Sequence, residues 1–122
     1  MKTRTKILTA ALAVVALIIG VAVATSWAPD QPVSVLAARW APPPSKFVQI
    51  AGMNVHLRDE GPADDPMPII LIHGTSASLH TWDGWAQTLS KQHRVIRFDL
   101  PGFGLTGPAP DDDYSVTRSS LA

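Results

Sequence analysis

The hydropathy pattern divides the chain into one long apolar run and a series of shorter segments in which apolar and polar residues alternate. The run extends from Ile7 to about Thr25 and consists almost wholly of Ala, Val, Leu and Ile. A helix of about 18 to 20 such residues is long enough to cross the hydrocarbon core of a bilayer. Residues 7–26 are therefore predicted to be a transmembrane helix or a signal sequence.

The residues that flank this run bear on its processing and orientation. The small residues at 22–24 fit a signal-peptide cleavage site, whereas the length of the run and the following Trp27 favour an uncleaved anchor. Three basic residues precede the run, at Lys2, Arg4 and Lys6. Basic residues are retained in the cytoplasm, so residues 1–6 are expected there and the remainder is expected in the periplasm or outside the cell. Cleavage would instead give a secreted protein.

Residues 27–45 are expected to form a Pro-rich linker beside the membrane. Apolar side chains recur there at helical spacing, at Val33, Leu36, Ala37 and Trp40. This stripe is consistent with a short helix at the membrane interface or with an ordinary linker turn, and the sequence leaves both open. Three prolines at 42–44 predict an extended spacer.

Residues 46–122 contain strand patterns of two kinds. Apolar and polar residues alternate at 46–50 and 53–58, and Ala51-Gly52 between them predicts the tight turn of an antiparallel hairpin. The residues from Pro68 to Ile72 are continuously apolar, which predicts a strand buried on both faces.

A strand–helix–strand unit is predicted after that point. Ser78 is a suitable N-cap for a helix from Leu79 to about Gln92, and residues 94–98 have the composition of another strand. Two strands joined by a helix over about thirty residues form a βαβ unit with parallel pairing. A further helix is expected to begin near Val116.

Composition and charge exclude several kinds of site. The formal net charge is +0 without long runs of one sign, which gives no indication of nucleic-acid binding. Cysteine is absent, which excludes disulfides and thiolate zinc sites. His56, His80 and His93 are expected at the surface or at strand ends without metal-ligand spacing, and residues 111–113 are expected to form a solvated acidic loop. Neither a metal nor a cofactor is predicted.

The segment from Gly102 to Gly107 matches the dinucleotide-binding pattern G-x-G-x-x-G and follows a predicted strand. In that motif the last glycines open a helix whose N-terminus binds the pyrophosphate. Pro108 and Pro110 follow at once here, and three aspartates come next, so a helix in the required register is not expected. The glycines are predicted to shape a turn, and nucleotide binding is not predicted.

Two motifs together resemble the N-terminal part of the α/β-hydrolase superfamily. They are Ile69-Ile70-Leu71-Ile72-His73-Gly74, followed by Trp82, and Phe98-Asp99-Leu100-Pro101-Gly102-Phe103-Gly104. The resemblance extends from Lys46 to the end of the chain. It implies an incomplete α/β-hydrolase sheet, made of the hairpin and the βαβ unit and preceded by a transmembrane helix.

The resemblance implies an oxyanion-hole role for the His-Gly turn. In this fold one donor is a backbone N–H from the loop after the third strand. The family pattern favours the backbone N–H of Thr75, with Ser76 second, while His73 and Gly74 shape the turn. His73 itself precedes the nucleophile position, whereas the base of the superfamily follows it, so His73 is not expected to be the base.

The nucleophile, acid and base of the superfamily have no counterpart in these 122 residues, because no G-x-S-x-G sequence occurs. The chain is therefore expected to stop before the nucleophile elbow and to be inactive alone. The Thr75-Ser76 pair favours esterases, carbon–carbon bond hydrolases and haloperoxidase-like members over dehalogenases and epoxide hydrolases, and an ester or similar carbonyl compound is the expected small-molecule substrate. A non-catalytic, membrane-tethered binding or interaction module is the alternative.

Overall fold

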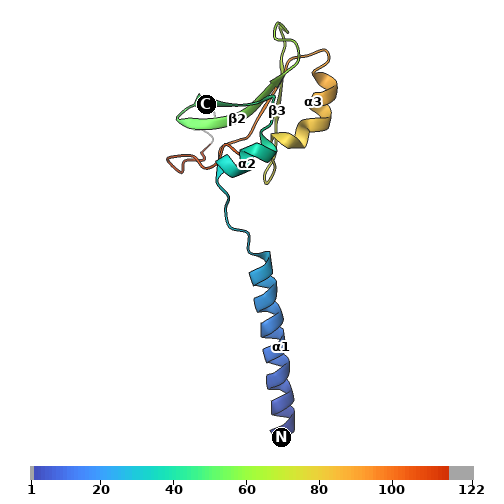
Figure 1. Ribbon diagram of the computed structural model, residues 1–122, viewed down its shortest axis with the longest axis vertical. Helices are drawn as coiled ribbons and strands as arrows, with labels where there is room; N and C mark the ends of the chain where they lie inside the picture. The colour runs from blue at the N-terminus through green and yellow to red at the C-terminus, as the bar shows by residue number, and fades with distance from the viewer. Residues whose placement is uncertain (1, 116–122) are drawn as a thin grey trace. The chain divides into compact units, whose positions relative to one another are not determined.

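The computed structural model describes residues 2–115 and divides the chain into two compact units, 1–31 and 32–122 (Figure 1). The helix predicted near Val116 lies outside the described residues. The elements, in chain order, are α1 (Lys2–Ser26), α2 (Val33–Trp40), β1 (Ser45–Ile50), β2 (Met53–Glu60), β3 (Ile69–Ile72), the 3₁₀ helix η1 (Leu79–Trp82), α3 (Asp83–Leu89) and β4 (Val95–Phe98).

The first unit contains the helix α1. Its stretch Thr3–Ser26 contains an 18-residue window with a mean hydropathy of 2.9, and it is long and apolar enough to cross a membrane. A signal sequence at an N-terminus would have the same character. The hydroxyls of Thr9 and Thr25 donate to the carbonyls of Thr5 and Val21 one turn earlier, so these polar groups are satisfied within the helix.

The predicted hairpin is confirmed. β1 and β2 pair in antiparallel register, with Ile50 opposite Met53 and Ser45 opposite Arg58. The connecting residues Ala51 and Gly52 have φ angles of 49° and 78°, and two positive φ angles give the turn the twist that matches the two strands.

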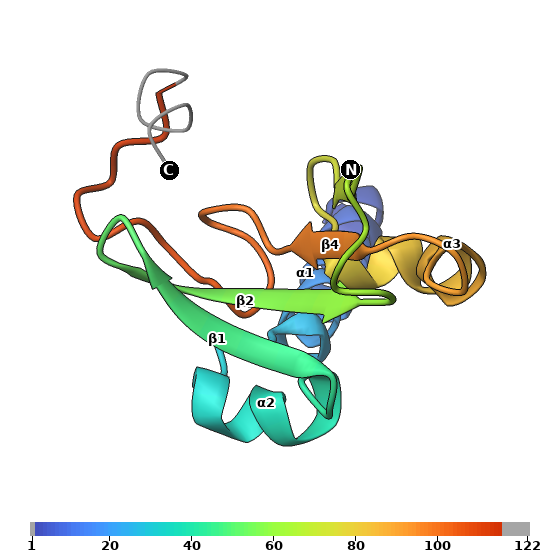
Figure 2. The ribbon, with the colours of Figure 1, turned by 90° about the horizontal axis from the view of Figure 1, so that it is seen from above.

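The four strands form one mixed sheet with the order β1-β2-β4-β3. Figure 2 shows β2 between β1 and β4. β3 and β4 pair in parallel and β2 and β4 in antiparallel, which confirms the predicted parallel pair.

The prediction that the third strand is buried on both faces is wrong for the described residues. β3 lies at the edge of the sheet, and the side chains of Ile70 and Ile72 are 56% and 55% exposed. Their apolar character indicates a covered face, but no described segment covers them. Together with neighbours on β2 and β4, Ile72 lines an apolar groove of about 440 Å³.

The helical connection between β3 and β4 is shorter and less regular than predicted. Ser78 caps it as expected, because its hydroxyl accepts from the backbone N–H of His80. The connection begins as the 3₁₀ helix η1 and continues as α3, which ends at Leu89 rather than near Gln92. Trp85 points to solvent and is 64% exposed, although its spacing fits the apolar stripe.

The segment predicted as a linker contains structure of its own. A helix forms there: α2 begins after Pro32 and half-buries Leu36 and Ala37, while its position at a membrane interface stays a prediction. It belongs to the same compact unit as the sheet. The prolines do not form the predicted extended spacer, because the N–H of Ser45 donates to the carbonyl of Pro42 at 3.0 Å and closes a turn.

The two faces of the sheet differ in character. Met53 and Val55 of β2 pack with Ala109, Ile50 and Phe98 in an apolar cluster on one face. Alternate residues of the same strands point to the opposite face, and two of them are both polar and buried. That second face carries His56 and Arg97 and positions the site described next.

Candidate functional site: the turn after β3 and its supports

The turn from His73 to Ser76 leaves β3 at its carboxyl end, the edge at which ligands bind in open α/β sheets. His73 is buried, whereas Gly74, Thr75 and Ser76 are exposed. Ser76 has a φ of 58°, which is uncommon for a residue other than glycine. The turn therefore holds its backbone open to solvent in a conformation of the kind that clusters at functional sites.

The imidazole of His73 joins this turn to the segment after β4. Its Nε2 accepts from the backbone N–H of Leu100 at 3.0 Å, so Nδ1 carries the proton and donates to the carbonyl of Gly74 at 2.8 Å. Both ring nitrogens are used in these contacts. The ring also contacts Phe103 edge-on, with centroids 5.5 Å apart. His73 thus serves as a brace between the two loops in the structure.

The bond to His73 sets the direction of the next N–H group. The Gly74–Thr75 peptide is trans, and the C=O and N–H of a trans peptide point in opposite directions. Because the Gly74 carbonyl points at the buried imidazole, the Thr75 N–H points away from it. Among residues 2–115 no acceptor takes a hydrogen bond from the backbone N–H of Thr75 or Ser76.

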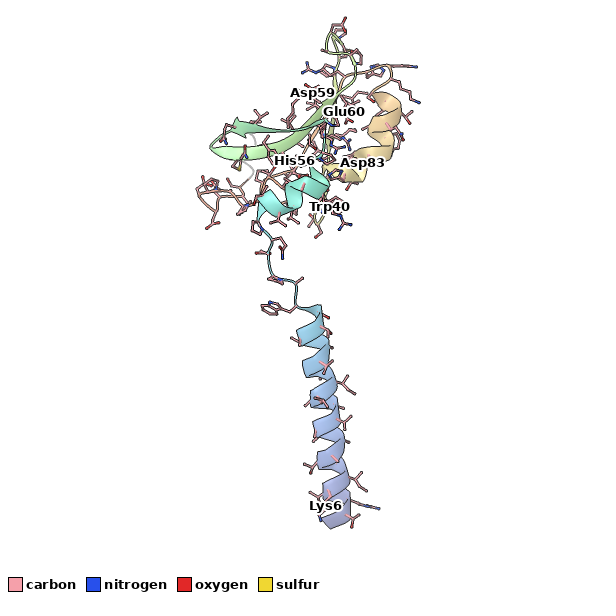
Figure 3. The ribbon with its side chains drawn as sticks, viewed as in Figure 1. Lys6, Trp40, His56, Asp59, Glu60 and Asp83 are labelled. Carbon is pink, nitrogen blue, oxygen red and sulfur yellow. The ribbon has the colours of Figure 1, made fainter. Side chains whose placement is uncertain are left out.

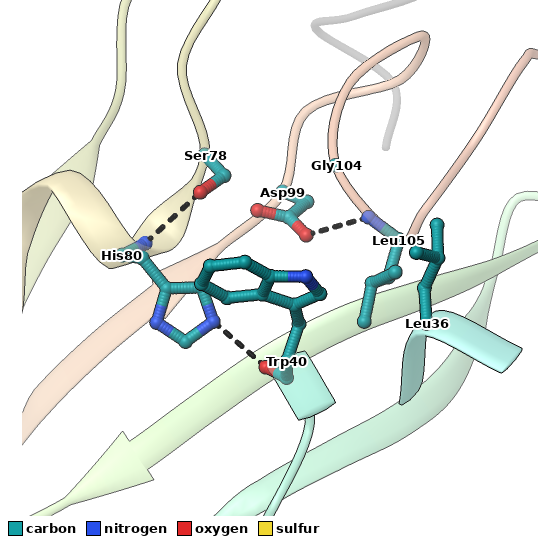
Figure 4. A pocket seen from close by; sticks show the side chains of 7 residues that line it. All are labelled: Leu36, Trp40, Ser78, His80, Asp99, Gly104 and Leu105. Carbon is teal, nitrogen blue, oxygen red and sulfur yellow. Dashed lines mark hydrogen bonds between the residues drawn. The ribbon is translucent and has the colours of Figure 1, made fainter. Parts of the chain in front are cut away.

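The buried carboxylate of Asp99 contacts the loop that follows β3 and the glycine-rich loop that follows β4. Asp99 follows β4 and is 1% exposed. Its oxygens accept from the backbone N–H of Leu79 at 2.7 Å, from that of Leu105 at 2.9 Å, and from Nδ1 of His56 at 2.8 Å. Figure 4 shows the bond from Leu105. One side chain therefore holds the start of η1 and the Gly-rich loop together.

Burial and hydrogen bonding act in opposite directions on this carboxyl. Burial alone would raise the pKa of Asp99, but the hydrogen bonds from His56, Leu79 and Leu105 outweigh it and lower the pKa below its ordinary value. Asp99 is therefore ionised at neutral pH. Asp99 lies in the Phe98–Gly104 motif that resembles the α/β-hydrolase superfamily, but the sequence alone did not predict a role for it.

The expectation that His56 lies at the surface or at a strand end is wrong. Its side chain is 0% exposed and lies between Asp99 and the hydroxyl of Ser45. Figure 3 labels His56 within the folded part, close to Asp83. The ring also stacks on Phe47, with centroids 5.1 Å apart. The alternation of β2 could have placed His56 on the face of Arg58, but its partner is 43 residues away in sequence.

A second polar group on this face is the buried guanidinium of Arg97. It pairs with Glu60 at 2.9 Å and with Asp83 at the start of α3. Burial acts to raise the pKa of Asp83, yet hydrogen bonds from Arg97 and His80 lower it overall. Arg97 thereby fixes α3 to the centre of the sheet, which positions the connection that begins with the His-Gly turn.

The Gly-rich segment forms turns, as predicted, and no helix begins between Gly102 and Gly107. The N–H of Gly102 donates to the carbonyl of Gly107 at 2.7 Å, which closes the loop on itself. Gly104 has a φ of 51°, and a Cβ there would overlap the carboxylate of Asp99. Glycine is required because this backbone passes directly over the carboxylate.

A cavity of about 260 Å³ lies between α2 and the two loops (Figure 4). Trp40 and Leu36 line it from α2, and His80 lines it from η1. The Nε2 of His80 donates to the carbonyl of Trp40 at 2.7 Å, which ties α2 to the residues that follow the His-Gly turn. Among the described residues no group of three or more potential metal ligands occurs.

A mixed sheet with a βαβ unit and an open turn at the carboxyl end of β3 defines the beginning of an open α/β fold. Residues 67–121 match the family model described as alpha/beta hydrolase fold. Over this part the chain belongs to the α/β-hydrolase superfamily.

Proteins similar to this chain include several hydrolases. It is 32% identical over 74 residues to Epoxide hydrolase 2 of Caenorhabditis elegans, a match that covers 60% of this chain and 21% of that protein. It is 39% identical over 69 residues to a pimeloyl-[acyl-carrier protein] methyl ester esterase of Legionella pneumophila (strain Lens), covering 57% of this chain and 26% of the esterase.

A solved structure of a bacterial membrane phospholipase A is also similar. It aligns with a TM-score of 0.59 and 26% identity, over 99% of this chain and 38% of that protein. In all three comparisons the chain spans well under half of the protein it matches.

Proposed function

We propose that this chain contributes the oxyanion-binding turn of a hydrolase that acts on esters or related carbonyl compounds. The observation that carries the proposal is the backbone N–H of Thr75, which is exposed, unpaired within residues 2–115, and directed by the His73–Gly74 hydrogen bond. The N–H of Ser76 is the second candidate donor. Acyl transfer develops negative charge on a carbonyl oxygen, and fixed N–H donors stabilise that charge.

The relatives support ester chemistry for this site. The name of the methyl ester esterase states an activity on esters. The membrane phospholipase A aligns over 99% of this chain, which includes the turn. The epoxide hydrolase shows that the same scaffold serves other hydrolyses. A small-molecule ester is therefore the substrate class that we propose, without a cofactor or metal.

We propose that the nucleophile for hydrolytic turnover lies outside these 122 residues, because none of their serines lies in a G-x-S-x-G sequence. In this fold the second oxyanion donor is the N–H that follows the nucleophile. We therefore propose that residues 46–122 form the N-terminal part of the hydrolase domain, and that alone they do not turn over esters.

The long apolar helix supports a membrane-tethered or exported hydrolase. We propose residues 1–6 as a cytoplasmic segment, 7–26 as the anchor or signal, and 27–45 as the connection to the hydrolase part, with the latter exported. Alkaline carbonate extraction tests the tether: an anchored chain stays with the membrane pellet at its full mass. Release of a shortened chain would indicate cleavage near residue 24.

The oxyanion donor is tested by replacing the N–H rather than the side chain. In the hydrolase that carries this segment together with its nucleophile, Thr75→Pro removes the backbone donor and should lower kcat by about 10²–10³-fold. Thr75→Val keeps the N–H and serves as the matched control, with kcat within a few-fold of the parent. Equal kcat values for the two variants would contradict the proposal.

A further inference from the structure

A hydroxyl, an imidazole and a carboxylate are connected in series at the start of β1, away from the His-Gly turn. The Oγ of Ser45 lies 2.9 Å from Nε2 of His56, and Nδ1 of His56 lies 2.8 Å from a carboxylate oxygen of Asp99. A nucleophile within hydrogen-bond reach of a base, with the base oriented by a third group, is the arrangement that activates a serine.

The strand register explains why three segments meet here. Ser45 pairs with Arg58 across the hairpin and Phe47 pairs with His56, and paired residues of antiparallel strands point to the same face. Ser45, His56 and Arg58 therefore share one face. The backbone N–H of Asp99 donates to the carbonyl of His56 at 2.9 Å, which brings the carboxylate beneath the ring.

The direction of each hydrogen bond follows from the state of Asp99. Asp99 accepts two backbone N–H groups and is ionised, so Nδ1 of His56 must donate to it. The Nε2 atom is then the acceptor, and the hydroxyl of Ser45 donates its proton to it. This is the protonation state in which a serine transfers its proton to the base as its oxygen attacks.

Arg58 contacts the same oxygen. Its Nε donates to Oγ of Ser45 at 2.9 Å, and a second nitrogen, Nη2, donates to the carbonyl of Pro42 at 3.4 Å. A hydroxyl oxygen has two lone pairs, so the bond from Arg58 leaves one for attack on an electrophile. The adjacent positive charge stabilises the negative charge that develops as the proton departs.

We propose that Ser45 is a nucleophilic acyl-acceptor site, activated by His56 and Asp99, which takes a single acyl or phosphonyl group from a donor whose leaving group departs as a stable anion. Aryl esters, thioesters and fluorophosphonates belong to this class. Ser45 is partly exposed and begins an edge strand, so a donor can approach it from solvent.

The transfer balances without another reactant. The Oγ of Ser45 forms a bond to the carbonyl carbon of an acyl donor or to the phosphorus of a phosphonyl donor, and the bond from that atom to the leaving group breaks. The leaving group takes the electron pair and departs as an anion, while the hydroxyl proton moves to Nε2 of His56. The resulting imidazolium is paired with the carboxylate of Asp99 at 2.8 Å.

Burial limits what this site can do. His56 is 0% exposed, so its imidazole contacts the serine but cannot reach a leaving group or an attacking water. Donors that need protonation of the leaving group, such as alkyl esters, should not react. Water is not activated either, so the acyl group should remain on Ser45 and each chain should react once.

The test uses the full 122-residue chain in detergent, treated with a fluorophosphonate probe and separately with p-nitrophenyl acetate. The expected result is one probe per chain, located on Ser45 by peptide mass spectrometry, and release of one equivalent of p-nitrophenolate without further turnover. Labelling should be lost in Ser45→Ala and retained in Ser34→Ala, which changes an exposed hydroxyl on α2.

Two variants test whether Ser45 reacts because His56 and Arg58 activate its hydroxyl or only because the hydroxyl is exposed. His56→Gln should slow labelling by about 10²-fold or more, since it removes the base. Because His56 is buried and this variant can fail to fold, Arg58→Gln provides a second measure and should slow labelling at least several-fold in a chain with unchanged circular dichroism. An unlabelled wild-type chain, equal labelling of Ser45→Ala, or a wild-type rate in folded Arg58→Gln would each overturn the proposal.

Discussion

The loops that follow β3 and β4 leave the same edge of the sheet but differ in how their backbone groups are used. After β4, the loop closes on itself through Gly102 and Gly107, and its Leu105 N–H donates to the buried Asp99. After β3, Thr75 and Ser76 expose N–H groups that no acceptor among residues 2–115 satisfies. The internally bonded loop is a support, and the open loop is where a ligand can bind.

The contrast also explains why the open loop can stay open. An exposed turn with unpaired N–H groups would relax toward its own carbonyls unless its peptides were held. His73 holds the Gly74 carbonyl, and Asp99 holds the Leu79 N–H at the far end of the turn. The open loop therefore depends on two contacts with the segment after β4: Asp99 accepts from the Leu79 N–H, and the Leu100 N–H donates to His73. Removing the Asp99 contact tests this dependence.

The largest effect is expected from Asp99→Ala. It leaves His56 and the backbone N–H groups of Leu79 and Leu105 buried without an acceptor. Breaking a buried pair of this kind costs about 3–5 kcal/mol in the free energy of unfolding. Urea unfolding followed by tryptophan fluorescence measures it, with the exposed Asp64→Ala as control. A loss below about 1 kcal/mol would show that Asp99 does not support the loops.

A smaller effect is expected from Gly104→Ala in the closed loop. The new Cβ would overlap the Asp99 carboxylate, and the φ of 51° disfavours alanine. The two terms together should cost about 2–4 kcal/mol. Gly107→Ala is the matched control because its φ is 70° but no atom lies within 4 Å, so only the backbone term of about 1 kcal/mol remains. Equal losses would exclude the steric contact.

The contribution of Asp99 to the free energy of unfolding should be lost at acidic pH. The pKa of Asp99 is lowered from 3.8 by its hydrogen bonds, although burial opposes them, so the unfolded chain binds protons at a higher pH than the folded one. The stabilisation is complete above that ordinary value and is lost as the pH falls toward the lowered pKa. Urea midpoints measured between pH 7 and pH 3 should decrease below about pH 5. In Asp99→Ala the urea midpoint should depend less on pH. If its dependence on pH is unchanged, carboxylates other than Asp99 cause the decrease.

The smallest effect is expected from Gly74→Ala in the open loop. Gly74 has no positive φ, and a Cβ there would meet no atom within 4 Å. The free energy of unfolding should therefore change by no more than about 0.5 kcal/mol, as for other substitutions at exposed positions. The same urea titration measures it. A loss comparable to that of Gly104→Ala would remove the distinction between the two loops.

Sequence reasoning correctly predicted those features that depend on neighbouring residues. The alternation on either side of Ala51-Gly52 gave the hairpin, Ser78 gave the helix cap, and the prolines after Gly107 indicated that the glycines form a turn. Each depends on local backbone preferences or on side-chain periodicity along a few residues.

The errors concern residues whose environment depends on distant partners. The apolar character of β3 indicated two covered faces, but an edge position leaves Ile70 and Ile72 exposed among the described residues. His56 was expected at the surface or at a strand end, because it is one of the polar residues that alternate with apolar ones in its strand. Its face is instead occupied by Asp99 and Ser45, which only the register of three strands brings together.

By itself the sequence determined the apolar helix, the hairpin, the parallel pair and the turns, because each follows from the spacing of apolar residues or from the φ angles that glycine and proline allow. Only the tertiary structure decided which N–H groups remain unpaired and which serine meets an imidazole. Those outcomes depend on hydrogen bonds between residues as far as 43 positions apart. Such bonds form only once β4 pairs with β2 in the observed register, and no local pattern specifies that pairing.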